Sequence, residues 1–218
     1  KTYPYHTFVN LDARDASSYS GSGTEWTNLT NSSISGTLVN GPSYQNSSPK
    51  SFQFDGTNDY VSFPSGFGTA NSFTIESWVN LASNSGYRVI SNMDGWNTGY
   101  IHFQFYNGSL LFEVNGATPV ASKSFTYTFS LNTWYHVVVT YDNTAQKLYY
   151  YVNGELTDTI TYISPSAIPN IAFKIGSWGG TDRFFQGKIG TFRYSNSALT
   201  AKQIKKVFTT NKSDFGVN

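Results

Sequence analysis

Short segments of alternating apolar and polar residues recur along the chain from Ser51 onward, and they constrain the fold more than any other feature. Gly, Asn and Pro residues separate the segments. Alternation with a period of two places one face of a strand against a core, and frequent turns are typical of an antiparallel sandwich. The segments predict strands at residues 51–54, 59–63, 72–81, 87–92, 99–106, 109–115, 123–129, 133–141, 146–152, 156–162, 171–176 and 185–194.

Two of the turns are specific enough to predict tight hairpins. Asn107-Gly108 and Asn153-Gly154 each lie between two strand-like segments. A type I′ turn needs two consecutive residues that tolerate positive φ, and Asn-Gly meets this need. The segment from Trp134 to Tyr141 differs from the others because both of its alternate faces are largely apolar. We therefore expect it in the middle of a sheet, with cover on both sides.

One short helix is expected near the end of the chain. Thr200 is followed three residues later by Gln203, the spacing of a capping box, and Ile204, Val207 and Phe208 follow at helical spacing. We predict the helix at residues 199–210, packed against an edge of the sandwich.

The length of 218 residues suits one β domain, since sandwiches of this size often have a single core. We expect residues 1–50 to form a loop-rich lead-in packed on the core and residues 51–198 to form the sandwich. The lead-in is rich in Ser, Thr, Asn and Gly but carries apolar anchors, namely Trp26, Leu29, Ile34, Leu38 and Tyr44. The chain starts at Lys1 without a Met or a signal-like segment, so we expect a processed or excised piece of a larger protein.

The charge of the chain excludes several classes of partner. Charged residues are only 12% and the net charge is +1, with Lys and Arg scattered, so nucleic acid and anionic membrane surfaces are not expected partners. No apolar run reaches the length of a membrane span, so we expect no membrane insertion. The chain has no cysteine, which removes disulfide and thiol chemistry.

Five blocks of sequence resemble the successive blocks of laminin-G-like jelly rolls in the concanavalin A-like lectin/glucanase superfamily. They are FQFDGTNDYV at 52–61, FTIESWV at 73–79, WYHV at 134–137 with TYD at 140–142, YVNG at 151–154 and GKI at 187–189. Their order and spacing match over roughly residues 50 to 208. The resemblance implies an all-β antiparallel sandwich of the concanavalin A-like jelly-roll type, acting as a non-catalytic module that binds glycans or other proteins.

A narrower resemblance concerns the two ends of the chain. Residues 18–29, 36–38 and 40–41, together with the ending at 207–216, are similar to copies of this domain in viral, phage and environmental surface proteins. The chain departs from that pattern at Asp214, where an Arg is expected. The likeness implies an extracellular, cell-surface or virion-surface location. The implied partner is a glycan or glycoprotein on a cell surface, or protein partners in a larger assembly.

Two polar loops, 91–99 and 177–183, each carry a tryptophan. A sugar presents an apolar C–H face and a ring of hydroxyls, so its binders combine an aromatic ring with polar donors and acceptors. We expect ligand contact from Trp96 and Trp178 as stacking rings and from Asn92, Asp94, Asn97, Asp182 and Arg183 as polar contacts. The alternative is that either tryptophan simply fills the end of the sandwich.

The turn at Asp55, Asn58 and Asp59 offers oxygen atoms that could hold one structural Ca²⁺. The alternative is an Asx turn, in which Asp55 accepts hydrogen bonds from its own backbone. Relatives often place an acidic residue after the Gly-x-Ile block, where this chain has Gly190 followed by Thr191. That departure favours the simple turn.

A glycan-degrading enzyme is the main rival function, because some jelly-roll relatives are hydrolases or lyases. The Glu-x-Asp-x-x-Glu run of the hydrolases is missing, and Glu76 stands alone in its strand. His136 lies between apolar neighbours and is expected to be a buried structural histidine. We therefore expect a lectin-like carbohydrate-binding module and no enzyme, with a structural or adhesion module contacting proteins in a capsid, fibre or surface assembly as the alternative.

Overall fold

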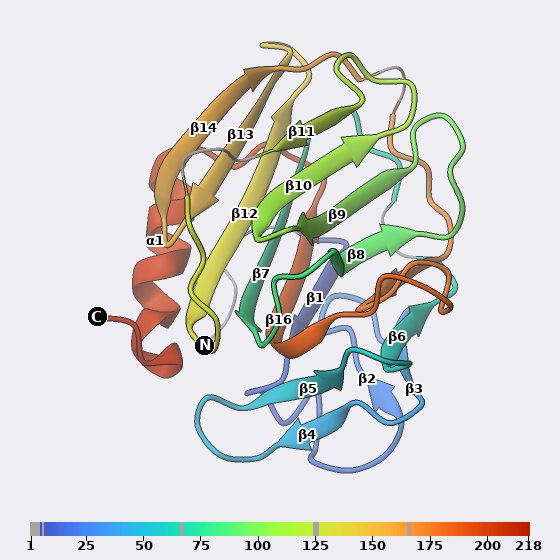
Figure 1. The fold of residues 1–218 in the computed structure, drawn as a ribbon, viewed down its shortest axis with the longest axis vertical. Helices are drawn as coiled ribbons and strands as arrows, with labels where there is room; N and C mark the ends of the chain where they lie inside the picture. Colours follow the sequence, from blue (N-terminus) through green and yellow to red (C-terminus); the bar gives the residue numbers. More distant parts are fainter. Residues whose placement is uncertain (1–4, 6, 66–67, 124–126, 165–166) are drawn as a thin grey trace.

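Two antiparallel sheets packed face to face form the body of the protein, and one helix lies against the outside of the first sheet (Figure 1). The computed structural model describes residue 5 and residues 7–65, 68–123, 127–164 and 167–218. The chain is thus an all-β antiparallel sandwich with a short C-terminal helix, as its alternating segments predict.

The first sheet has the strand order β14-β13-β12-β7-β16-β5-β4, and β1 also pairs with β16. Its strands are β14 (Glu155–Thr161), β13 (Lys147–Val152), β12 (Trp134–Asp142), β7 (Phe73–Leu81), β16 (Gln186–Ser195), β5 (Ser51–Asp55), β4 (Ser43–Gln45) and β1 (Val9–Asp12). The strand β12 lies in the middle of this sheet and is buried over nearly its whole length, which confirms the expectation from its two apolar faces.

The second sheet has the order β11-β10-β9-β8-β15-β6-β3-β2. Its strands are β11 (Ala121–Lys123), β10 (Ser109–Val114), β9 (Ile101–Tyr106), β8 (Tyr87–Met93), β15 (Phe173–Ile175), β6 (Tyr60–Phe63), β3 (Gly36–Val39) and β2 (Glu25–Trp26). The inner faces of the two sheets meet in one large core dominated by aromatic rings. Phe73 of the first sheet packs against Phe112 of the second, for example, with ring centroids 5.6 Å apart.

Both predicted hairpins are present. Asn107 and Gly108 have φ of 47° and 79° between β9 and β10, and Asn153 and Gly154 have φ of 51° and 76° between β13 and β14. These pairs of positive φ values are those of a type I′ turn.

One predicted strand, 123–129, differs from the structure. The strand β11 ends at Lys123, residues 124–126 lie outside the described part, and residues 127–129 form no strand. The alternation there has another cause: the rings of Tyr127 and Phe129 pack on Tyr135, at centroid distances of 5.7 and 5.0 Å. These aromatic residues anchor a loop and do not pair with a neighbouring strand.

The lead-in contains short strands as well as loops. It contributes β1 and β4 to the first sheet and β2 and β3 to the second. These strands have two to four residues, which is too short for a recognisable alternation. Trp26 is fully buried and its ring lies 4.7 Å from that of Phe52. The lead-in is therefore an integral part of the sandwich.

The helix α1 (Ala201–Asn211) is followed by a short 3-10 helix η1 (Lys212–Phe215). Thr200 and Gln203 form both hydrogen bonds of the predicted capping box. Ile204, Val207 and Phe208 are buried against the outer face of the first sheet, where Phe208 packs on Trp78 and Ile204 on Val138. The helix thus covers the outer face of one sheet and leaves that of the other to the loops. Within the described ranges, no helix has the length and apolar character needed to span a membrane.

Candidate functional site

The outer face of the second sheet carries a group of polar and aromatic side chains from β8 and β9. On β9, Ile101, Phe103 and Phe105 point into the core, so His102, Gln104 and Tyr106 must point outward. On β8, Asn92 lies opposite His102 and Tyr87 lies opposite Tyr106. Two loops, 94–99 after β8 and 177–184 after β15, bring further side chains to this face.

The two predicted tryptophans meet on this face at His102. The ring centroid of His102 lies 4.4 Å from that of Trp96 and 5.5 Å from that of Trp178. Trp96 is 37% exposed and Trp178 is half-buried, so neither is sealed in the core. We call Trp96, His102 and Trp178 the tryptophan platform.

Arg183 extends this platform on the side of Trp178. Its guanidinium carbon lies 4.5 Å from the centroid of Trp178 and 4.1 Å from that of Tyr87, so the cation is held between two rings. The side chain remains 21% exposed, and its charged neighbour is Asp182, with Arg183 Nε and Asp182 Oδ2 3.9 Å apart. Because the side chain is partly exposed, a ligand on this face can reach the guanidinium.

Polar side chains below the tryptophans fix the platform in place. Lys174 Nζ donates to Asp94 Oδ2 at 2.6 Å, and Asn92 Nδ2 donates to Gln104 Oε1 at 3.2 Å. Asn115 Nδ2 donates to the carbonyl oxygen of Trp96 at 2.6 Å. The Oδ1 atoms of Asn92 and Asp94 are buried and have no hydrogen-bond partner among the described residues. Both oxygens are closed to solvent, so they lie beneath the platform and do not face a ligand on it.

The seven residues predicted for ligand contact therefore take different places. Trp96, Trp178 and Arg183 come together on one face, while Asn92 is fully buried and Asp94 is half-buried beneath them. The remaining two, Asn97 and Asp182, are exposed on the two loops.

Three residues of this face were missed by sequence reasoning: His102 of the platform itself and, next to it, Tyr87 and Tyr106. Burial, helped by the nearby charge of Arg183, outweighs the hydrogen bond with the Gly95 carbonyl oxygen and lowers the pKa of His102 to about 4, so the imidazole is neutral at pH 7. A neutral imidazole packs between two indoles without the cost of a buried charge. No motif singles out these residues, because they come together only through the pairing of β8 with β9.

The carboxylates of the turn at Asp55 accept hydrogen bonds from the backbone, as expected of the simple turn. Asp55 Oδ1 accepts hydrogen bonds from the backbone N–H groups of Thr57, Asn58 and Asp59 at 2.7 to 3.3 Å, which is an Asx turn. Asp59 Oδ2 accepts from the Asp55 N–H at 3.0 Å. These carboxylates are directed to backbone donors, and no cluster of three or more His, Cys, Asp or Glu suited to a metal occurs in the described part of the chain.

Calcium is consequently expected to leave the stability of the protein unchanged. Thermal melting of the chain in EDTA and in millimolar calcium chloride should give the same midpoint, because a ligand that does not bind the folded state cannot stabilise it. A midpoint several degrees higher in calcium would show that the turn, or another site, holds the ion.

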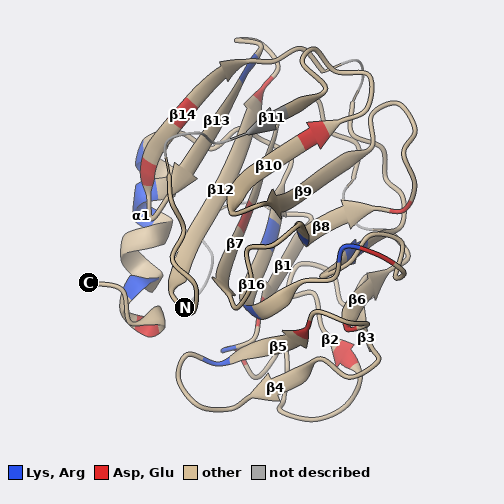
Figure 2. Cartoon of the chain, in the orientation of Figure 1, with Lys and Arg blue, Asp and Glu red and all other residues tan. Residues whose placement is uncertain are grey.

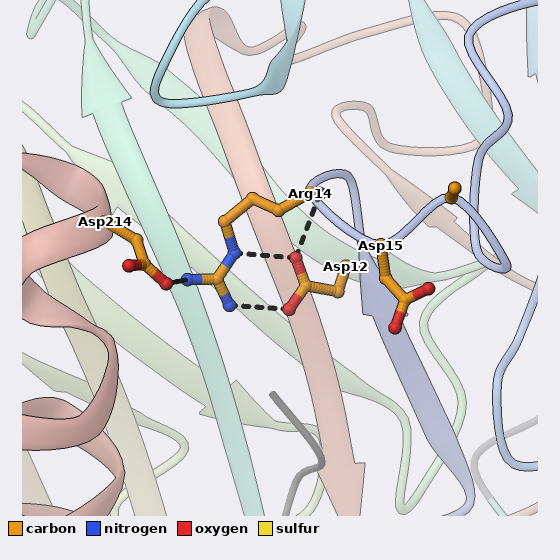
Figure 3. A pocket seen from close by; sticks show the side chains of 5 residues that line it. Asp12, Arg14, Asp15 and Asp214 are labelled. Carbon is orange, nitrogen blue, oxygen red and sulfur yellow. Dashed lines mark hydrogen bonds and ion pairs between the residues drawn. The ribbon is translucent and has the colours of Figure 1, made fainter.

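A separate polar cluster lies on the outer face of the first sheet, beside the end of α1. Figure 3 shows Arg14 between Asp12 and Asp214, at the edge of a pocket of about 380 Å³. Arg14 Nη2 lies 2.5 Å from Asp12 Oδ2, and Arg14 Nη1 lies 2.9 Å from Asp214 Oδ2. Arg14 thus pairs with two of the three acids that line this pocket, and the cluster ties β1 to the C-terminal segment.

This cluster continues into the interior through Arg193, which is 2% exposed. Arg193 Nη2 lies 3.0 Å from Asp12 Oδ2, and Arg193 Nη1 lies 2.8 Å from Glu76 Oε1. His136 is also fully buried, with Nε2 3.7 Å from Glu76 Oε2 and the ring stacked on Trp78. Glu76 is thus buried beside Arg193 and His136, and the burial of His136 confirms the expectation from the sequence.

The enclosure of Glu76 predicts a dependence of stability on acid. Burial alone would raise the pKa of Glu76, but His136 and Arg193 outweigh burial and lower it from 4.5 to about 2. The stabilisation is therefore present above about pH 4.5 and is lost as pH falls towards 2, and it amounts to roughly 3 kcal/mol. Urea unfolding at pH 5, 4, 3 and 2 should show a smaller loss for Glu76→Gln than for the wild type. Equal losses in the two chains would contradict this role of Glu76.

Figure 2 shows that charged residues are scattered along the chain, with Lys and Arg most frequent along α1. Those lysines are Lys202, Lys205 and Lys206, and they lie on the helix that covers the first sheet. The tryptophan platform lies on the outer face of the other sheet. The platform is therefore not part of a basic surface.

Comparison with solved structures shows the same fold in several proteins. Domain 4 of AbnA, an extracellular arabinanase from Geobacillus stearothermophilus solved with arabinotriose, has a TM-score of 0.72 and 17% identity, covering 92% of this chain and 97% of that one. The binding domain of botulinum neurotoxin serotype G has a TM-score of 0.69 and 13% identity over 95% of this chain, which spans 52% of the toxin domain. A heptameric SAP-like pentraxin from Limulus polyphemus has a TM-score of 0.62 and 19% identity, over 73% of this chain and 81% of that one.

At these identities the likeness shows the fold, and the sequence itself identifies the family. A search of curated protein sequences returned no match. Residues 55–205 match the laminin-G-like family model described as the concanavalin A-like lectin/glucanases superfamily. Since the matched range is more than half of the 218 residues, the chain belongs to the laminin-G-like family of the concanavalin A-like lectin/glucanases superfamily.

Proposed function

We propose that the chain is a non-catalytic carbohydrate-binding module whose ligand lies on the tryptophan platform. The observation that carries this proposal is the meeting of Trp96 and Trp178 at His102 on the outer face of the second sheet. Two partly exposed indoles that come from different loops and share one buried support are a prepared apolar surface. Such a surface suits the C–H face of a sugar ring.

Polar groups around the platform match the hydroxyls of a sugar. Arg183 offers N–H donors beside Trp178, while Asn97 and Asp182 are exposed on the two loops. A mixture of donors and acceptors around an aromatic ring suits a neutral polyol better than a lipid or a highly charged polymer.

Two of the structural neighbours support this proposal. The arabinanase domain was solved with a bound trisaccharide, and the toxin domain is a binding domain. Neither observation transfers the ligand itself, since the identities are 17% and 13%. They support the use of this sandwich as a binding module.

The arrangement of the acids favours binding without catalysis. Hydrolysis of a glycosidic bond uses two carboxyl groups on either side of the bond. Glu76 and Asp12 are buried and both bind Arg193, away from the platform. Beside the platform, Asp94 binds Lys174 and Glu113 accepts from Gln104. We infer that these carboxylates support the fold and the platform.

The proposed setting is the outside of a cell or virion, where such a module would attach a larger protein to a glycan or glycoprotein. The low content of charged residues, 12%, suits recognition of a neutral ligand. This setting follows the resemblance of the chain's two ends to viral, phage and environmental surface proteins.

A glycan array tests the proposal directly. The 218-residue chain, fluorescently labelled, should bind a group of related neutral oligosaccharides, and the free oligosaccharide should compete for the signal. Binding to sugars that share no structural feature would indicate non-specific binding and would count against the proposal. A blank array together with stable oligomers or a cross-linked protein partner would overturn it in favour of an adhesion module.

A further inference from the structure

The series of ring contacts does not end at Trp178. Arg183 lies against Tyr87, and the ring of Tyr87 lies 4.4 Å from that of Tyr106, with planes at 34°. Both tyrosines are half-buried and lie opposite each other on β8 and β9, on the same outer face as His102. The groups therefore form one continuous series, which we call the extended platform: Trp96, His102, Trp178, Arg183, Tyr87 and Tyr106.

The extended platform is longer than a single sugar ring. His102 and Tyr106 are four residues apart on β9, and at about 3.3 Å per residue their Cα atoms are separated by roughly 13 Å. Arg183 itself lies beside β8, because the Val89 N–H donates to the Arg183 carbonyl oxygen at 3.1 Å. The tyrosine pair and the tryptophan pair thus mark two ends of one surface.

The backbone of Arg183 indicates that its position in the middle of this surface matters. Its φ is 55°, a left-handed conformation that glycine and asparagine adopt most easily. The other described non-glycine residues with positive φ are Asn40, Asn107, Asn132, Gln146 and Asn153. An arginine at such a position lowers stability relative to Asn or Gly, and strain of this kind is concentrated at functional sites. We attribute the presence of an arginine at this position to the contacts of its guanidinium with Trp178 and Tyr87.

From these observations we infer that the ligand is a linear chain of neutral sugars, bound along β9 over at least two subsites. This inference rests on the function proposed above and adds to it a second subsite, formed by Tyr87 and Tyr106. Arg183 lies between the subsites, where its in-plane N–H groups can donate to hydroxyls of adjacent sugar units. A single sugar would contact only one end of the surface.

Isothermal titration with arabino-, xylo- and cello-oligosaccharides of one to five units tests this inference. For the series that binds, the Kd of the wild type should fall at least tenfold between one unit and three or four units. In Tyr106→Ala this gain with length should be lost, while the affinity for the single sugar stays within about twofold. Tyr106→Leu serves as a second variant, since it keeps the apolar volume for folding and removes the flat ring.

Tyr149→Ala is the matched control, because Tyr149 is also a half-buried tyrosine but packs on the outer face of the first sheet. It should bind every length like the wild type. Arg183→Asn should weaken binding of the longer chains while its melting temperature stays equal to or above that of the wild type, since Asn relieves the left-handed backbone.

The outcomes separate the inference from the function on which it rests. An affinity that depends on Trp178 but is the same for one sugar unit and for four units would overturn the second subsite. The proposed function as a carbohydrate-binding module would stand. Wild-type affinities of Tyr106→Ala and Tyr106→Leu at every length would overturn it too. Failure to bind any sugar, here and on the array, would overturn both.

Discussion

Replacement of Arg193 by Met is expected to lower the free energy of unfolding by about 3–5 kcal/mol, the usual cost of removing one partner of a buried ion pair. Arg193 is the buried cation between Glu76 and Asp12, at 2.8 and 3.0 Å. It also donates from Nε to Asn10 Oδ1 at 2.8 Å. Without it, Glu76 stays buried with no arginine in contact, and β1 loses the side-chain bonds to β16 that supplement its backbone pairing. Urea unfolding at pH 7 measures the loss.

Lys205→Met provides the matched control. Lys205 pairs with Glu155 between α1 and β14, but both side chains are largely exposed. An exposed pair contributes about 0–1 kcal/mol, so this variant should unfold nearly like the wild type. If Arg193→Met lost no more stability than Lys205→Met, the ion pairs of Arg193 with Glu76 and Asp12 would not stabilise the first sheet.

Replacement of Trp178 by Ala is expected to weaken glycan binding about 30-fold or more, which corresponds to roughly 2 kcal/mol. Trp178 lies at the junction of the platform, because its indole contacts both His102 and Arg183. Its removal takes away a stacking surface and frees the guanidinium from one of its two rings. Titration of the best glycan from the array measures the change.

Trp178→Phe should retain part of the affinity, since a smaller flat ring can still stack. Leu131→Ala is a control for truncation of an exposed apolar side chain in a loop of the other sheet, and it should bind like the wild type. Equal affinity of Trp178→Ala and the wild type would remove this loop from the binding site.

Much of the fold follows from local pattern. The alternating segments predict the strands because each has one face in the core, and Asn-Gly predicts the two hairpins because few other pairs tolerate two positive φ values. The capping box at Thr200 is equally local, since its two hydrogen bonds join residues three apart. The two tryptophan loops also stand out, because large aromatic rings among polar loop residues need a reason to be there.

The parts that could not be predicted depend on how distant strands align. Simple alternation along β8 would place Tyr87, Val89 and Ser91 on one face, but a register shift between Val89 and Ser91 turns Asn92 to the face of Tyr87. The sequence does not show that shift. It therefore could not predict that Tyr87 lies on the same face as His102 and the two tryptophans. The partners of Arg193 were hidden for the same reason, since Glu76 and Asp12 are more than one hundred residues away along the chain.

The two outer faces of the sandwich therefore have different roles in this account. The face of the first sheet is covered by α1 and held by a buried ion cluster, so it stabilises the fold. The face of the second sheet is left to two loops, whose aromatic residues remain partly exposed on a rigid support. Binding is proposed only for the second face.

The indole N–H signals of the five tryptophans test this account most directly. In ¹⁵N-labelled protein titrated with the best-binding oligosaccharide, the signals of Trp96 and Trp178 should shift and reach saturation at the Kd found by calorimetry. Trp26 and Trp78 are fully buried and serve as internal controls whose signals should stay in place. If the sugar saturates the protein while the signals of Trp96 and Trp178 do not move, the platform is not the binding site.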